Sequence, residues 1–118
     1  MSYQIPDKKK FIKALNAIAT QLPKSYIELL KAHYRAPKHR ITASELANAV
    51  GYHNYKAANL NYGKLASIIM DQFGIAKSEK VNIEFLVRFV MPGDQGNEEI
   101  IWVLRPEVAS ALEELNWT

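Results

Sequence analysis

Apolar residues near the N-terminus recur at i, i+4, i+7 and i+11, at Phe11, Leu15, Ile18 and Leu22. With Asp7 as the N-cap, this spacing predicts an amphipathic helix within residues 1–22, which Pro23 ends. A second apolar stripe predicts a helix over residues 24–35. Pro37 ends that helix, because the residue before a proline disfavours helical torsions.

A capping box, Thr42-Ala-Ser-Glu45, predicts the start of a short helix over residues 43–50. Gly51 follows it where a left-handed C-terminal cap favours glycine. Ala47 is the small residue that a crossing helix needs before such a turn. This spacing is typical of the first helix and turn of a helix-turn-helix. An ordinary helix pair in a small α+β core is the alternative.

A longer helix is predicted over residues 55–73, with Asn54 as its N-cap, and completes a helix-turn-helix over residues 42–74. At about 100° per residue, its buried stripe contains Ala58, Tyr62, Leu65, Ile69 and Phe73. The opposite, outer face contains Lys56, Asn59, Leu60, Gly63, Lys64 and Ser67. Asparagine pairs with adenine and lysine binds guanine or phosphate, so this outer face is the candidate reader of DNA.

Gly63 lies on that outer face, although a glycine inside a helix costs about 1 kcal/mol relative to alanine. Close approach of the helix backbone to a nucleic-acid strand is one reason for a glycine there. A break of the helix into two pieces is the alternative.

An aromatic and polar cluster surrounds the turn and contains Tyr52, Tyr55, Tyr62, His53, Asn54, Asn59 and Asn61. Stacking of the tyrosines on a base is one role. Burial of their rings with hydrogen-bonded hydroxyls is the alternative. Asn54, Tyr55 and Asn61 join the outer face as candidate nucleic-acid contacts.

The C-terminal part of the chain changes to strand patterning. Residues 85–90 and 100–104 are two apolar, β-branched or aromatic runs, so we expect a β-hairpin over residues 83–105. Pro106 begins a last helix within residues 106–117. The order helix, helix, short helix, long helix, hairpin, helix predicts an α+β fold of the winged helix-turn-helix type, with all 118 residues in one domain.

Charge is distributed unevenly along the chain, whose formal net charge is +3. Residues 1–64 carry eleven lysines and arginines against three acids, a net +8. Residues 65–118 carry four against nine, a net −5. A basic half of this size favours an anionic polymer as partner, with a lysine-rich solvated surface as the alternative.

Lys38, His39 and Arg40 precede the capping box, where a loop can contact phosphates and position the recognition helix. The loop of the predicted hairpin instead carries acids, namely Asp94, Glu98 and Glu99. These acids would repel phosphate, so the hairpin either serves the structure alone or marks a separate partner surface.

The sequence lacks the residue patterns that disulfides, metal sites and nucleophilic catalysis require. The absence of cysteine excludes a disulfide, a thiolate zinc site and a cysteine nucleophile. His33, His39 and His53 fall on different predicted elements, so we expect each to be a surface or half-buried side chain rather than a metal ligand. The sequence contains no nucleophile elbow, signal peptide or apolar run long enough to span a bilayer. We therefore expect a cytoplasmic, non-enzymatic protein without a cofactor or membrane partner.

Two segments carry a family resemblance: Ile41 to Leu65 (ITASELANAVGYHNYKAANLNYGKL) and Trp102 to Trp117 (WVLRPEVASALEELNW). They resemble the N-terminal module that precedes the nuclease domain in some bacterial HNH-type restriction endonucleases. The resemblance covers about residues 22–117 and implies a DNA-recognition part of a bacterial or phage defence system. The His/Asn/His nuclease motif is missing, so no nuclease activity is carried over.

The function that the sequence predicts is binding of double-stranded DNA, with the long helix in the major groove and the basic half on phosphates. The alternative is a protein-interaction module of the same fold that docks on a defence or regulatory complex, such as a phage-encoded inhibitor. An enzyme is the third alternative. Whether the chain dimerises is left open by its sequence.

Overall fold

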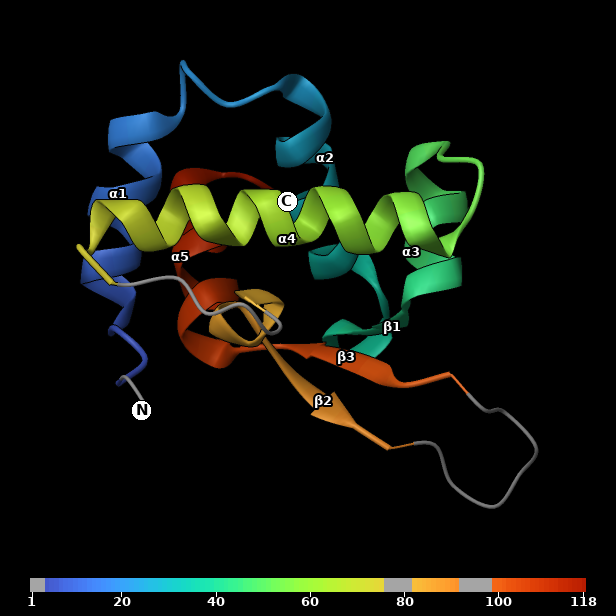
Figure 1. The fold of residues 1–118 in the computed structure, drawn as a ribbon. Coiled ribbons are helices and arrows are strands. Elements are labelled where there is room, and N and C mark those ends of the chain that lie inside the picture. The colour runs from blue at the N-terminus through green and yellow to red at the C-terminus, as the bar shows by residue number, and fades with distance from the viewer. Residues whose placement is uncertain (1–3, 76–81, 92–98) are drawn as a thin grey trace.

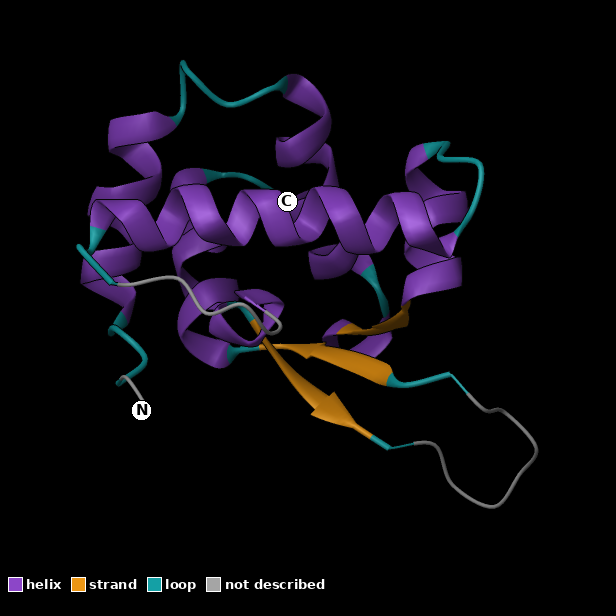
Figure 2. Ribbon diagram, viewed as in Figure 1, coloured by secondary structure: helices purple, strands orange, loops and turns teal. Residues whose placement is uncertain are grey.

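The structure is a computed structural model that describes residues 4–75, 82–91 and 99–118. Five α-helices and a three-stranded antiparallel sheet form within these residues, which confirms the α+β class (Figure 1). The helices gather on one side of the molecule and the strands lie along the other (Figure 2).

Helix α1 (Lys8–Ile18) begins where the sequence predicts, because the Asp7 carboxylate accepts a backbone N–H of its first turn at 3.0 Å. The expectation that this helix runs on to Pro23 is wrong. The chain turns after Ile18, whose carbonyl accepts the Leu22 N–H at 3.0 Å. Leu22 is still buried in the core although it lies after the end of α1. Its apolar spacing therefore indicated burial correctly, but not helix.

The predicted helix pair is present as α3 (Ala43–Val50) and α4 (Tyr55–Gln72). Helix α4 is continuous through Gly63, so the alternative of a break there is wrong. A strand that the sequence did not indicate, β1 (Arg40–Thr42), leads into α3. Three residues are too few to show a period, and their pairing partner lies far along the chain.

Three caps delimit this helix pair as predicted. In the capping box, the Thr42 hydroxyl accepts the Glu45 N–H at 3.1 Å and the Glu45 carboxylate accepts the Thr42 N–H at 2.9 Å. Gly51 ends α3 with a φ of 83°, a left-handed conformation that favours glycine. The Asn54 side chain begins α4 by accepting the Ala57 N–H at 3.1 Å.

The predicted hairpin is formed by β2 (Val87–Val90) and β3 (Ile101–Leu104), and β3 also pairs with β1 to give the order β1-β3-β2. The expectation of a strand from residue 85 is corrected, since a 3₁₀ turn, η2 (Asn82–Phe85), precedes β2. This turn places Phe85 in the core beside α1, where its ring lies 5.5 Å from that of Phe11.

Helix α5 (Pro106–Leu115) follows β3 and has Pro106 in its first turn, as predicted. The loop predicted to follow β2 lies outside the described residues from 92 to 98. Its two acids Asp94 and Glu98 fall in that segment, whereas Glu99 is described.

The sheet has one buried face and one open face. Ile41, Trp102 and Phe89 are register partners across the three strands on the buried face. The Tyr62 ring of α4 lies 5.5 Å from the Trp102 ring, so α4 contacts this face of the sheet through Tyr62. The outer face of α4 therefore points away from the sheet.

His33, on α2 (Lys24–Arg35), is fully buried, which corrects the expectation of a surface or half-buried side chain. Its Nε2 lies 3.0 Å from the carbonyl oxygens of both His39 and Trp102. A carbonyl can only accept, so Nε2 carries the proton, and Nδ1 accepts the Tyr62 hydroxyl at 2.8 Å. All the polar atoms of the ring are thereby satisfied.

We predict that His33 makes the stability of the protein dependent on pH. Burial lowers the pKa of His33 from its ordinary 6.5 to about 4, against the opposing effect of the two carbonyls. As the pH falls, the His33 imidazole is therefore protonated in the unfolded chain before it is protonated in the folded protein. The free energy of unfolding decreases as the pH falls below 6.5. The expected loss from this group is about 2 kcal/mol between pH 7.5 and pH 5, measured by urea unfolding.

A matched control is His53→Gln, which removes an exposed imidazole and leaves the pH dependence in place. Nuclear magnetic resonance of the wild-type ring gives a readout that needs no variant. A His33 ring that becomes charged above pH 6 in the folded protein would contradict the prediction.

Candidate nucleic-acid interface

The outer face of α4 is open to solvent over its N-terminal half. Lys56, Asn59 and Lys64 are exposed, and Leu60 is 58 % exposed between them. The helix has no acidic residue before Asp71, near its C-terminal end. The exposed N-terminal half therefore combines cations and an amide with no carboxylate on the same helix.

The 3₁₀ turn η2 covers the middle of this face. The Asn82 amide donates to the Ser67 hydroxyl at 2.8 Å, and Ile83 lies beside Gly63. Ser67 and Gly63 are consequently half-buried rather than fully exposed. Between helix and turn lies a cleft of about 530 Å³, lined by Asn59, Leu60, Gly63, Lys64, Ser67, Asn82 and Ile83.

Other residues near the turn that the sequence predicted to contact DNA form hydrogen bonds within the protein. The Asn54 side chain caps α4, and the Asn61 amide donates to the Ala57 carbonyl at 2.9 Å. Tyr62 is fully buried, which excludes it from stacking on a base. Burial also raises the pKa of the Tyr62 hydroxyl, so it stays protonated as a donor to His33. Tyr55 is 46 % exposed at the start of α4 and remains a candidate contact.

The loop before β1 is held by His39. Lys38 and His39 have positive φ angles of 56° and 59°, which non-glycine residues adopt at a cost. The His39 ring lies 2.9 Å from the Tyr34 carbonyl through Nδ1, and the His39 carbonyl accepts from His33. The half-buried His39 thus shapes the loop, while Lys38 is exposed at its tip.

Arg40 belongs to the open face of the sheet. In the strand register Arg40 pairs with Val103, which pairs with Arg88, so the two arginines flank one half-buried valine. Strands lie about 4.8 Å apart, which places the arginine backbones roughly 10 Å from each other. Lys38 and Arg88 both line a neighbouring cavity of about 340 Å³ against α5.

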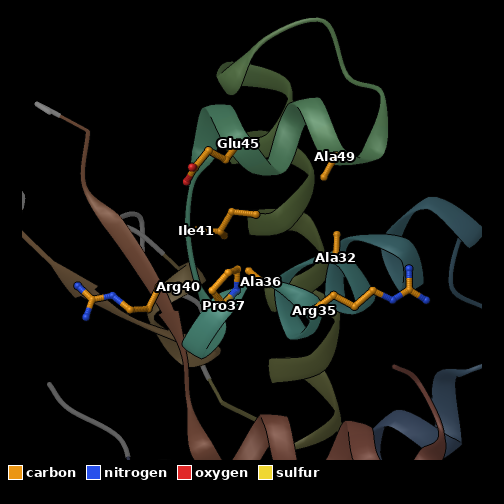
Figure 3. A pocket seen from close by; sticks show the side chains of 8 residues that line it. All are labelled: Ala32, Arg35, Ala36, Pro37, Arg40, Ile41, Glu45 and Ala49. Atoms are coloured by element: carbon orange, nitrogen blue, oxygen red, sulfur yellow. The ribbon is translucent and has the colours of Figure 1, made fainter.

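Figure 3 shows the groove that separates Arg40 from the other arginine of this region, Arg35. The groove has a volume of about 330 Å³ and lies between α2 and α3, with mostly small or apolar side chains along it. The two arginine side chains point away from each other at its opposite rims. Arg35 donates to the backbone oxygen of Thr118 at 2.7 Å, so it is occupied by the C-terminal end of the chain.

The residues that the sequence grouped into one site thus lie on two surfaces. We call one of them the α4 surface; it consists of Tyr55, Lys56, Asn59, Leu60 and Lys64. We name the sheet surface by Lys38, Arg40, Arg88 and Val103. Sequence reasoning missed Arg88, although its isolated charge within the apolar run of residues 85–90 marks it as the outward position of a strand.

Glu99 is the one acid of the predicted hairpin loop that lies within the described residues, and it contacts α3. The Glu99 carboxylate accepts the Ser44 N–H at 3.3 Å, at the N-terminus of α3. A carboxylate is favourable there because the first amides of a helix lack partners and carry positive partial charge. Glu99 therefore ties the base of the hairpin to the helix pair.

Two further properties concern the described residues as a whole. No three of their histidine or acidic side chains gather as metal ligands would. None of their helices is both long and apolar enough to cross a bilayer. Comparisons with protein-family models, with curated proteins and with solved structures find no match to this chain.

We predict that Asn54→Ala lowers the free energy of unfolding by about 1 kcal/mol, because it removes the N-cap of α4. Asn54→Ser restores most of that loss, since a serine hydroxyl can accept the same N–H. Urea unfolding of both variants measures the effect. An alanine variant as stable as the wild type would show that the cap contributes nothing.

Proposed function

We propose that this protein binds double-stranded DNA through the α4 surface, as a winged helix that uses α4 as its recognition helix. The arrangement of elements supports the winged-helix assignment. β1 lies between α2 and α3, and its pairing with β3 joins the hairpin to the helix pair. α4 contacts this sheet through the Tyr62 and Trp102 rings, and its exposed Lys56, Asn59 and Lys64 are left open to solvent.

The observation that carries the proposal is the chemistry of the exposed N-terminal half of α4. Lys56 and Lys64 are two helical turns apart and Asn59 lies between them, all exposed. An α-helix fits the major groove, where an asparagine reads adenine and lysines contact guanine or phosphate. In this proposal the protein is a recognition module or regulator linked to bacterial or phage defence, and it acts without catalysis.

We predict that Lys56→Ala and Lys64→Ala each weaken binding to every duplex and lower the salt slope by about one, because each removes a phosphate contact. Asn59→Ala instead costs about 1–3 kcal/mol and relaxes the preference at one base pair. Fluorescence anisotropy with duplexes at several salt concentrations measures both effects. All three variants keep the wild-type stability within about 0.5 kcal/mol, as exposed positions do.

Lys13→Ala is the matched control. Lys13 is an exposed lysine on α1, and it lies near Gln72, at the C-terminal end of α4. It removes the same charge at a distance from the α4 surface and is expected to change affinity little. Equal losses for Lys13→Ala and Lys56→Ala would mean that only the overall charge matters. A wild type that binds no duplex at low salt would refute the proposal.

A second candidate function, docking on a protein, is favoured by the sheet surface. Lys38, Arg40 and Arg88 are exposed, and no described carboxylate pairs with them in an ion pair. Half-buried aliphatic side chains, Val103 and Ile101, lie between and beside the arginines. Cations that flank an aliphatic strip suit a protein segment with carboxylates and aliphatic side chains better than a uniformly charged phosphate backbone.

We predict that a peptide of alternating glutamate and leucine binds this sheet surface. The double variant Arg40→Ala with Arg88→Ala is expected to weaken peptide binding at least fivefold, and Lys56→Ala is expected to leave it unchanged. Anisotropy of the labelled peptide measures both. If the two arginine substitutions weaken duplex binding and leave the peptide unaffected, the sheet surface contacts DNA and this second function is wrong.

A further inference from the structure

The cleft between α4 and η2 adjoins the α4 surface, with which it shares Asn59, Leu60 and Lys64. We propose that it receives a single nucleotide of the bound DNA, with its base turned out of the helical stack. This inference rests on the proposed function and adds to it the kind of DNA that binds best: a duplex with an unpaired nucleotide.

Gly63 gives the first argument, because neither its backbone conformation nor its described neighbours require a glycine there. Its backbone is helical, unlike that of Gly51 and Gly74, whose φ angles are positive. Among the residues that the structure describes, a methyl group at residue 63 would meet only the Ile83 side chain, at 4.0 Å, an ordinary contact distance. Alanine would therefore fit and would favour the helix. What glycine adds is open space on the wall of the cleft.

The second argument is that the cleft is preformed. The hydrogen bond of 2.8 Å from the Asn82 amide to the Ser67 hydroxyl holds η2 against α4. Ile83 is only 4 % exposed and anchors the turn in the core. With about 530 Å³, the cleft falls within the ~300–1,000 Å³ of small-molecule sites, which is ample for one base and its sugar.

The third argument is the chemistry of the lining. Leu60 is 58 % exposed at the rim and offers an apolar surface to the face of a base. The Asn59 amide can donate and accept at a base edge, as asparagine does in base recognition. Lys64 supplies a cation at the rim for the phosphate of the same nucleotide. No carboxylate lines the cleft among the described residues.

The first test compares two labelled duplexes of the same sequence, one fully paired and one with a single unpaired nucleotide. We expect at least tenfold tighter binding of the bulged duplex, because its extra base is already free of the cost of unpairing. Equal affinity for the two duplexes would overturn the inference.

The second test is Gly63→Ala, which fills part of the cleft while favouring the helix. We expect its melting temperature to rise by a few degrees. We expect its affinity for the bulged duplex to fall at least fivefold and its affinity for the paired duplex to stay within twofold. A gain in stability together with a loss of binding separates this outcome from unfolding. Gln72→Ala, an exposed substitution on α4 outside the cleft, is the control and leaves both affinities unchanged.

The outcomes separate this inference from the proposed function. If the wild type binds neither duplex, the proposed function fails and the inference fails with it. If the paired duplex binds through Lys56 and Lys64, and Gly63→Ala binds both duplexes as the wild type does, only the inference is overturned.

Discussion

One buried imidazole fixes how the helices sit on the sheet. The His33 ring, on α2, bonds to main-chain carbonyls in the loop before β1 and in β3, and to a side chain of α4. A buried polar group that loses its partner costs about 1–3 kcal/mol. All three bonds form together only when α2, α4 and the sheet are in their native relation. The ring therefore favours one arrangement of these elements over other compact ones, in which its polar atoms would be buried without partners.

This constraint determines which face of α4 is free. Tyr62 gives its hydroxyl to His33 and sets its ring against Trp102, so the rotation of α4 about its own axis is fixed at that point. With about 100° per residue, positions 56, 60, 64 and 67 must then point away from the core. The candidate recognition surface is thus a consequence of a core contact. The same contact turns the other face of the sheet outward, with Arg40 and Arg88 on it.

The features that the sequence predicted well are those whose signals lie within a few residues. The capping box at Thr42, the glycine cap at residue 51 and the asparagine cap at residue 54 each depend on partners three or four positions away. His33 could not be read in this way, because its partners include a carbonyl 69 residues distant and carbonyls have no sequence signature. The strand β1 was not predicted for the same reason, since it forms only through its pairing with β3.

The candidate site shows the same division. Helical periodicity alone placed Lys56, Asn59 and Lys64 on one exposed face. Lys38 and Arg40, which were predicted to contact phosphates from the loop before the capping box, lie on the sheet surface instead of on α4, and their role in binding stays a prediction. Arg40 extends from a strand whose register partner, Val103, joins it to Arg88. Only the tertiary pairing of three strands could show this.

The charge asymmetry of the sequence also changes its meaning once the chain is folded. Acids of the C-terminal half lie against groups of the N-terminal half: Glu114 pairs with Lys8 at 2.9 Å, and Glu99 accepts an amide of α3. Glu113 accepts the hydroxyl of Tyr34 on α2. These contacts place carboxylates around α1, α2 and α3, while the α4 surface carries none. A screened field acts over about 10 Å in ordinary salt, so a DNA phosphate responds to the nearest charges rather than to the total. In the proposed complex, the charges nearest the DNA are therefore Lys56 and Lys64 of the α4 surface, whereas Lys38 and Arg40, which also belong to the net +8 of residues 1–64, lie on the sheet surface.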